Sequence, residues 1–304
     1  MNIVNFHCHP LDYNFRIYPP SNQISALEND NKIQNFCDRS NPVYLWRGMD
    51  APRRWKQTKK GRMFHEDLSI AAQGFYKIVL SALDLGFTLV GYRGTNETVE
   101  YLYKKMSDKI IPFAYLHPRN SNSVRNLDFW ITKRKFKGLK LYPGIGYYPD
   151  DHRFKAFFKR AEELQIPVLF HSGLNAPNPF LNPKYSHPIY LAALLARYPK
   201  LKIVAAHFGH PWFEETLAIA KFNSNLYIDL TCSGHSRMDM IKKAIKTIGP
   251  ERLVFGTDNP LCSASYFMEV MHQFGRSGIK DSHLNLIFGK NSLDITGVNN
   301  NPEE

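Results

Sequence analysis

The chain has 304 residues, of which 43% are hydrophobic and 22% are charged, a composition typical of a soluble globular protein. Its four cysteines, Cys8, Cys37, Cys232 and Cys262, form no C-x-x-C pair, so we expect a reducing, cytoplasmic location. No stretch approaches the roughly 18 apolar residues of a membrane span. The first residues also lack the pattern of a signal peptide, which argues against a membrane or secreted protein.

The formal charge is +12, from 39 Lys and Arg against 27 Asp and Glu. Such an excess can attract nucleic acid or small anions. The basic residues are scattered along the chain, and the densest group is Arg53–Lys60, which includes Trp55. This pattern favours a solvated basic surface over a nucleic-acid interface, so nucleic acid is not the expected partner.

Apolar runs rich in β-formers recur along the chain and predict eight strands. In chain order they are Ile3–His7, Phe87–Tyr92, Ile111–Leu116, Gly138–Tyr142, Pro167–His171, Lys202–Ala206, Leu226–Leu230 and Arg252–Gly256. Runs that are apolar at successive positions, rather than at alternate ones, are typical of parallel strands buried on both faces.

Stretches with helical spacing lie between most of these strands. They are Asn96–Met106, Asp151–Leu164, Pro188–Tyr198, Pro211–Phe222, Met238–Ile248 and Ala264–Phe274, with Leu68–Leu83 as the helix expected before the second strand. Eight such units predict an α/β protein with a closed (β/α)8 TIM barrel. An open doubly wound sheet is the alternative, which is disfavoured because no Gly-rich phosphate-binding turn follows the first strand.

The first unit is longer than the others because Pro10–Asp67 forms a long insertion after the first strand. The insertion leaves that strand at its carboxyl end, so we expect it to cap the barrel mouth, although the polar portion Ser21–Arg39 also fits a surface loop. We therefore predict a single barrel domain over residues 1–298, with the cap over 10–67 and a short tail over 299–304.

Side chains that bind metals stand at the ends of several predicted strands. His7 and His9 flank Cys8 in the first strand, and residues two apart point to the same side, so both imidazoles can reach one ion. His171 and His207 end the fifth and sixth strands, and Asp258 follows the eighth. A single histidine after an apolar run is more often structural, but the recurrence predicts one centre for Zn²⁺, or for Mn²⁺, Co²⁺ or Fe²⁺.

In these motifs the chain resembles the amidohydrolase superfamily, and within it the amidohydrolase-2 group, which is similar to aminocarboxymuconate-semialdehyde decarboxylase. The matching segments are Phe6–His9, Gly138–Pro143, Phe170–Gly173, Ala206–Gly209, Phe255–Pro260 and Phe288–Ser292. They span the predicted barrel and omit the insertion, and in combination and order they are specific for the group.

The resemblance implies a metal-dependent enzyme in which His7, His9, His171 and Asp258 hold one divalent metal, with Zn²⁺ as the expected ion. Asp258 would also take a proton from a metal-activated water. His207 would orient or polarise the substrate, or bind a second metal.

Lys140, in the fourth predicted strand, completes the implied catalytic set. In related two-metal enzymes such as dihydroorotases, a lysine at this place is carbamylated and bridges the ions. In the amidohydrolase-2 group a lysine here is common with a single metal, where an unmodified ammonium group would hold a substrate carboxylate. The resemblance favours the single metal over a second metal with a carbamylated lysine.

Polar residues after other strands indicate a small, anionic substrate, because residues at the carboxyl ends of barrel strands face the active site. The candidates for substrate binding are Arg93, His117, Arg119, Tyr142 and His235. No feature of the sequence identifies the substrate, and a homo-oligomer stays open.

Two reactions fit the same residues. The first is hydrolysis of an amide, ester or lactone of a small anionic molecule by metal-activated water, and the alternative is non-oxidative decarboxylation of a carboxylated substrate. Fold and ligands do not separate the two. A TatD-like metal-dependent deoxyribonuclease also fits the His7-Cys8-His9 start and the positive charge, but that family usually has a glutamate where this chain has Lys140. A non-catalytic binding module is disfavoured because no expected ligand is missing.

Overall fold

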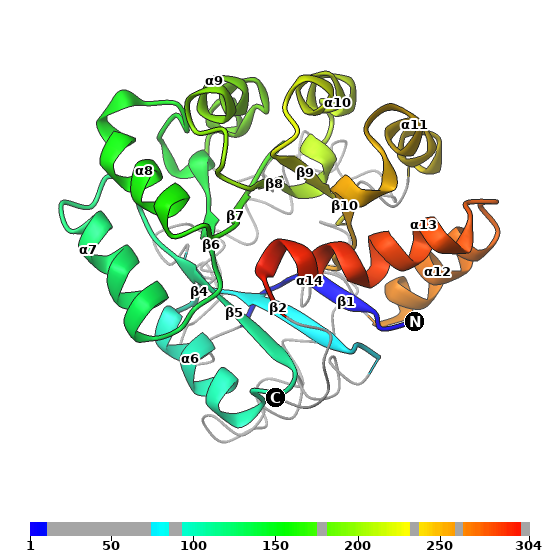
Figure 1. The fold of residues 1–304 in the computed structure, drawn as a ribbon, viewed down its shortest axis with the longest axis horizontal. Coiled ribbons are helices and arrows are strands. Elements are labelled where there is room, and N and C mark those ends of the chain that lie inside the picture. Colours follow the sequence, from blue (N-terminus) through cyan, green and yellow to red (C-terminus); the bar gives the residue numbers. More distant parts are fainter. Residues whose placement is uncertain (11–73, 85–92, 175–180, 232–236, 259–263, 299–304) are drawn as a thin grey trace, which may run out of the picture.

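The computed structural model describes residues 1–10, 74–84, 93–174, 181–231, 237–258 and 264–298. Its centre is a sheet of eight parallel strands, which Figure 1 shows as a ring with helices outside it. In hydrogen-bonded order the strands are β1 (Val4–Cys8), β2 (Lys77–Ser81), β5 (Ile110–Tyr115), β6 (Gly138–Leu141), β7 (Val168–Phe170), β8 (Ile203–Ala205), β9 (Leu226–Asp229) and β10 (Leu253–Val254).

Two backbone hydrogen bonds join β1 to the segment that contains and follows β10. The amide of Phe6 donates to the carbonyl of Phe255 at 2.8 Å, and the amide of Asp258 donates to the carbonyl of His7 at 2.7 Å. The sheet therefore closes on itself, and the predicted (β/α)8 TIM barrel is confirmed. The closure also brings His7, in β1, and His9, just after it, next to Asp258 from the other end of the chain.

The second strand of the barrel differs from the prediction. Residues 77–81 form β2 between β1 and β5, so the helix predicted over Leu68–Leu83 is wrong in this part. The three central residues of β2 are all buried, and a short run that is buried throughout has no periodicity by which a strand could be told from a helix. The strand predicted over Phe87–Tyr92 lies outside the described residues.

Helices cover the outside of the barrel and, in the case of α14, the amino ends of its strands. They are α6 (Asn96–Lys105), α7 (Ser123–Asp128), α8 (Lys155–Glu163), α9 (Ile189–Arg197), α10 (Phe213–Phe222), α11 (Met238–Ile248), α12 (Ala264–Gly275), α13 (Asp281–Asn285) and α14 (Asn291–Thr296). A short antiparallel pair, β3 (Leu83–Asp84) and β4 (Arg93–Gly94), precedes α6. The six helices predicted after residue 95 all occur, whereas α13, α14 and α7 with its π-helical continuation Phe129–Lys133 were not predicted. No described helix is long and apolar enough to cross a membrane.

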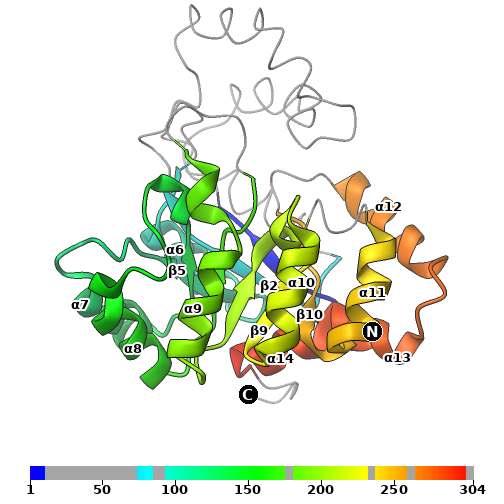
Figure 2. The same cartoon turned by 90° about the horizontal axis from the view of Figure 1, so that it is seen from above.

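The barrel has an apolar interior of its own, separate from the larger core between the strands and the helices. Its strand residues include Val4, Phe6, Val79, Ile111, Phe113, Leu169, Val204 and Val254. Two residues of α14, Leu293 and Ile295, belong to the same cluster. Lys202, just before β8, donates to the carbonyl of Ile295 at 3.4 Å, so α14 covers the amino ends of the strands (Figure 2). The functional site is therefore expected at the opposite end of the barrel, where the carboxyl ends of the strands lie.

The predicted cap and tail fall outside this description. Residues 11–67 of the insertion and residues 299–304 are not among the described residues, so the single domain over 1–298 and the cap over 10–67 stay predictions.

Candidate metal centre

Above the apolar interior of the barrel, at the carboxyl ends of the strands, the side chains are polar. In β6, Lys140 stands two residues after Gly138, and after β7, His171 stands two residues after the interior residue Leu169. The same side of β7 thus carries first an apolar and then a polar side chain. The structure brings together at this end of the barrel six residues singled out from the sequence: His7, His9, Lys140, His171, His207 and Asp258.

His7 and His9 direct their Nε2 atoms toward each other. The two Nε2 atoms are 3.0 Å apart, while Nδ1 of His7 lies 2.7 Å from Oδ2 of Asp229 and Nδ1 of His9 lies 2.8 Å from the carbonyl oxygen of Ser81. A carboxylate and a carbonyl only accept, so we assign a ring hydrogen to Nδ1 of both residues. The two Nε2 atoms then face the same point, an arrangement that a cation stabilises.

Asp258 adds a carboxylate to this pair. Its Oδ1 lies 3.5 Å from Nε2 of His7 and 3.3 Å from Nε2 of His9, and the ligand atoms of the three residues all lie within 4.8 Å of one another. Burial raises the pKa of Asp258, but the neighbouring His7 and His9 outweigh it, so the pKa lies well below its usual value. The carboxyl group is therefore ionised at neutral pH, as a metal ligand must be.

His171 stands beside this trio. Its ring stacks on Tyr142 at a centroid distance of 4.0 Å and lies 5.0 Å from the ring of His207. Its Nε2 is buried, and among the described residues no hydrogen-bond partner reaches it. A buried imidazole nitrogen without a partner is costly unless it binds something, so this atom fits a metal ligand. Burial and the neighbouring His207 lower the pKa of His171 well below its usual value, which keeps the ring neutral.

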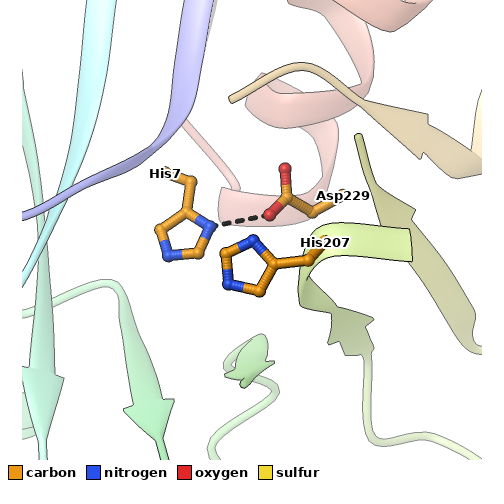
Figure 3. Close-up of side chains that lie close together, drawn as sticks. All are labelled: His7, His207 and Asp229. Carbon is orange, nitrogen blue, oxygen red and sulfur yellow. Dashed lines mark hydrogen bonds and ion pairs between the residues drawn. The ribbon is translucent and has the colours of Figure 1, made fainter. Parts of the chain in front are cut away.

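His207 follows β8 in a left-handed backbone conformation, with a φ of 59°. Its ring lies 5.1 Å from the ring of His7, and it is half-buried, whereas His7, His9 and His171 are buried. Figure 3 shows its imidazole beside the imidazole of His7 and the carboxylate of Asp229. Burial lowers the pKa of His207 to about 4, so the neutral ring is the form present at neutral pH.

Lys140 is almost completely buried, with 1% of its surface exposed, and its Nζ lies 2.8 Å from Nε2 of His7. Burial lowers the pKa of Lys140 to about 8, against the opposing attraction of Asp258 and Asp229. The amine is thus still protonated at pH 7, and it is a cation that donates to His7 at the centre of the cluster.

Of the residues predicted to bind substrate, only Tyr142 has a described contact with the histidine cluster. Tyr142 is buried against His171, and burial raises its pKa. His117 accepts a hydrogen bond from the amide of Arg119 at 3.2 Å and packs on Tyr147, and no described contact joins His117 or Arg119 to the histidine cluster. Arg93 lies in β4, where its backbone pairs with Asp84. His235 lies outside the described residues.

Asp229 also lies near the centre, although it was not among the residues predicted from the sequence. It ends β9, it is fully buried, and it contacts Nδ1 of His7. Its signal in the sequence was a carboxylate inside the apolar run Leu226–Leu230, because a charged residue is rarely buried without a partner. Burial raises the pKa of Asp229, whereas His207 and Thr231 lower it.

Comparison with known proteins agrees with this geometry. A closed parallel barrel that gathers imidazoles and carboxylates at the carboxyl ends of its strands is the architecture of a metal-dependent TIM-barrel enzyme. The family model described as amidohydrolase matches residues 4–295, nearly the whole chain. The chain belongs to the amidohydrolase family, and the resemblance found in the sequence is confirmed.

Solved structures show the same fold at low sequence identity. An uncharacterized TIM-barrel protein from Bordetella bronchiseptica is 21% identical, with a TM-score of 0.72 and coverage of 98% of this chain and 99% of that chain. A 5-carboxyvanillate decarboxylase from Sphingomonas paucimobilis is 16% identical, with a TM-score of 0.63 over 98% and 99% of the two chains. A dihydroxybenzoic acid decarboxylase from Polaromonas sp. JS666, solved with manganese and 2-nitroresorcinol, is 16% identical, with a TM-score of 0.62 over 99% and 98%. Among curated proteins, none matches the sequence.

Proposed function

We propose that this protein is a metal-dependent decarboxylase that removes a carboxyl group, without oxidation, from a small aromatic carboxylate. In this proposal His7, His9, His171 and Asp258 hold one divalent cation. A cation bound there would act as a Lewis acid and polarise an oxygen of the substrate. The donors are three imidazoles and one carboxylate, a set that suits Zn²⁺, Mn²⁺, Co²⁺ or Fe²⁺.

The observation that carries the proposal is the buried amine of Lys140. Its Nζ lies 2.8 Å from Nε2 of His7, inside the cluster and out of reach of bulk solvent. A buried ammonium group at this point suits a substrate carboxylate, which needs a compact positive charge to hold it. We infer that Lys140 binds the carboxylate that is lost.

Apolar and aromatic surface beside the cluster supports an aromatic substrate. Tyr142, Leu83 and Leu181 form a small buried cluster of their own, and Tyr142 stacks on His171. An aromatic ring bound against such surface buries apolar area and gains stacking contacts. The two decarboxylases with the same fold act on 5-carboxyvanillate and dihydroxybenzoic acid, as their names state, which agrees with this class of substrate.

The reaction itself needs no oxidant. The bond between the ring carbon and the carboxyl group breaks, carbon dioxide leaves, and the electron pair stays on the ring carbon, which then takes up one proton. His207 is the half-buried imidazole of the cluster, so we assign to it the relay of that proton from solvent. The other members of the cluster hold the substrate or the cation in place.

Hydrolysis is the second candidate, and one observation favours it. Asp258 is an ionised carboxylate 3.3 Å from Nε2 of His9, where it could accept a proton from an attacking water. The two reactions differ in their products, because only decarboxylation releases carbon dioxide. Product analysis therefore distinguishes them.

The test is to load the purified protein with Mn²⁺ or Zn²⁺ and to supply hydroxybenzoates, amides and lactones in turn. We expect carbon dioxide from a hydroxybenzoate and, in D₂O, one deuterium at the carbon that lost the carboxyl group. Asp258→Asn should abolish turnover. Lys140→Met should raise KM for the carboxylate, while the matched surface variant Lys290→Met leaves it unchanged, because Lys290 is exposed and pairs with Asp294. Hydrolysis of an amide or lactone without release of carbon dioxide would reject decarboxylation.

A further inference from the structure

The contact between His7 and Asp229 is buried on both sides. Nδ1 of His7 lies 2.7 Å from Oδ2 of Asp229, and neither side chain is exposed to solvent. Figure 3 shows the contact as the dashed line between the ring and the carboxylate. A charged acceptor in such a place fixes both the orientation of the imidazole and the nitrogen that carries its hydrogen.

Thr231 fixes the carboxylate in turn. Its backbone amide donates to Oδ1 of Asp229 at 3.0 Å, and its hydroxyl makes a short hydrogen bond to the same oxygen. Oδ1 is therefore occupied by two donors, and Oδ2 is left for His7. The segment that follows β10 packs against this group, because a Cβ on Gly256 would stand 2.8 Å from Oδ1 of Asp229 and 2.7 Å from Cβ of His7.

We infer that Asp229, held by Thr231, is a positioning residue that keeps His7 in the tautomer with hydrogen on Nδ1. The Nε2 lone pair of His7 then points into the centre, toward Nε2 of His9, Asp258 and the Nζ atom of Lys140, which is the direction a metal ligand needs. This inference rests on the proposed metal centre and adds a residue to it. His7, His207 and Asp229 also lie close enough to hold an ion, but the hydrogen bonds already made by both Asp229 oxygens argue for orientation instead.

Asp229→Asn provides a sharp test because an amide has one acceptor and one donor. An NH₂ group at the Oδ1 position would face the amide hydrogen of Thr231, which cannot move. The amide should therefore turn its NH₂ toward His7, whose ring hydrogen then moves to Nε2, where Nε2 of His9 accepts it and the hydrogen bond from Lys140 is lost. The substitution would thus reverse the tautomer of His7 and remove its lone pair from the centre, with almost no change in volume.

Two measurements test the inference. The first is ¹⁵N NMR of histidine-labelled, metal-free protein, with the His7 signals identified by their loss in His7→Gln. We expect hydrogen on Nδ1 of His7 in the wild type and on Nε2 in Asp229→Asn. The second is Mn²⁺ and Zn²⁺ affinity by titration calorimetry, where Asp229→Asn should bind about 10- to 100-fold more weakly. Asp294→Asn, in an exposed ion pair, is the matched control and should bind as the wild type does.

The possible failures are distinct. Hydrogen on Nε2 of His7 in the wild type would overturn the inference, even if Asp229→Asn does not fold. Equal metal affinity in the wild type and a folded Asp229→Asn variant would overturn it as well. If the wild type bound neither metal, the proposed function would fail, while the NMR result would still decide the role of Asp229.

Discussion

Gly256 occupies its place beside the proposed metal centre because it has no side chain. A Cβ at this position would come within 2.7 Å of Cβ of His7 and 2.8 Å of Oδ1 of Asp229, and it would also meet the hydroxyl of Thr231. All of these atoms are buried, so none can move aside into solvent. A single methyl group here should therefore disturb both the packing and the ligand geometry.

We predict that Gly256→Ala lowers the free energy of unfolding by about 1–3 kcal/mol, the usual cost of overpacking, and weakens metal binding as well. Urea denaturation and metal titration measure the two effects. Gly275→Ala is the control, because nothing lies within 4 Å of a Cβ at the end of α12. Equal stability of the two variants would show that the segment after β10 is looser than described.

At the scale of elements, α14 is attached to the last strand by one side chain. Asn291, at the start of α14, donates from Nδ2 to the carbonyl oxygens of Pro250 and Leu253, both at 2.8 Å. It is 3% exposed, so water cannot replace it without rearrangement. These bonds hold the helix that covers the amino ends of the strands.

We predict that Asn291→Ala costs about 1–3 kcal/mol of unfolding free energy, because the carbonyl of Leu253 is left buried without this donor. Asp294→Ala, one turn later in the same helix, removes an exposed ion pair with Lys290 and should cost at most about 1 kcal/mol. The comparison is made by urea denaturation, and an equal loss in both variants would contradict the role given to Asn291.

At the scale of the whole molecule, the centre joins strands from both ends of the chain. His7 and His9 come from β1 and the loop after it, His171 follows β7, and Asp258 follows β10. A cation bound by all four would stabilise the folded barrel and not the unfolded chain, where these residues are far apart.

We predict that Mn²⁺ or Zn²⁺ at about 100 times its Kd adds about 2.7 kcal/mol to the stability of the protein and raises its Tm by several degrees. EDTA should reverse the rise, and Mg²⁺, which prefers oxygen ligands, should produce less of it. His171→Gln should respond more weakly in the same calorimetric scans. A response as large as that of the wild type would remove His171 from the ligand set.

Local patterns in the sequence were sufficient to predict most of the strands of the barrel. Seven of the eight strands lie where the apolar runs predicted them, from β1 and from β5 onward, because continuous apolar runs are typical of a buried parallel sheet. β2 was missed, because a short buried run with little periodicity fits a helix as well as a strand. The error also concealed Ser81, whose carbonyl accepts from His9.

The sequence by itself determined which side chains could form the centre, since an H-x-H pair and polar residues at strand ends are local patterns. Whether they meet was decided by the tertiary structure, because closure between β1 and the segment after β10 brings Asp258 to His7. The carboxylate of Asp229 inside an apolar run indicated a buried acid, but its contact with His7 was decided by the tertiary structure, because a hydrogen bond between distant strands leaves no spacing in the sequence.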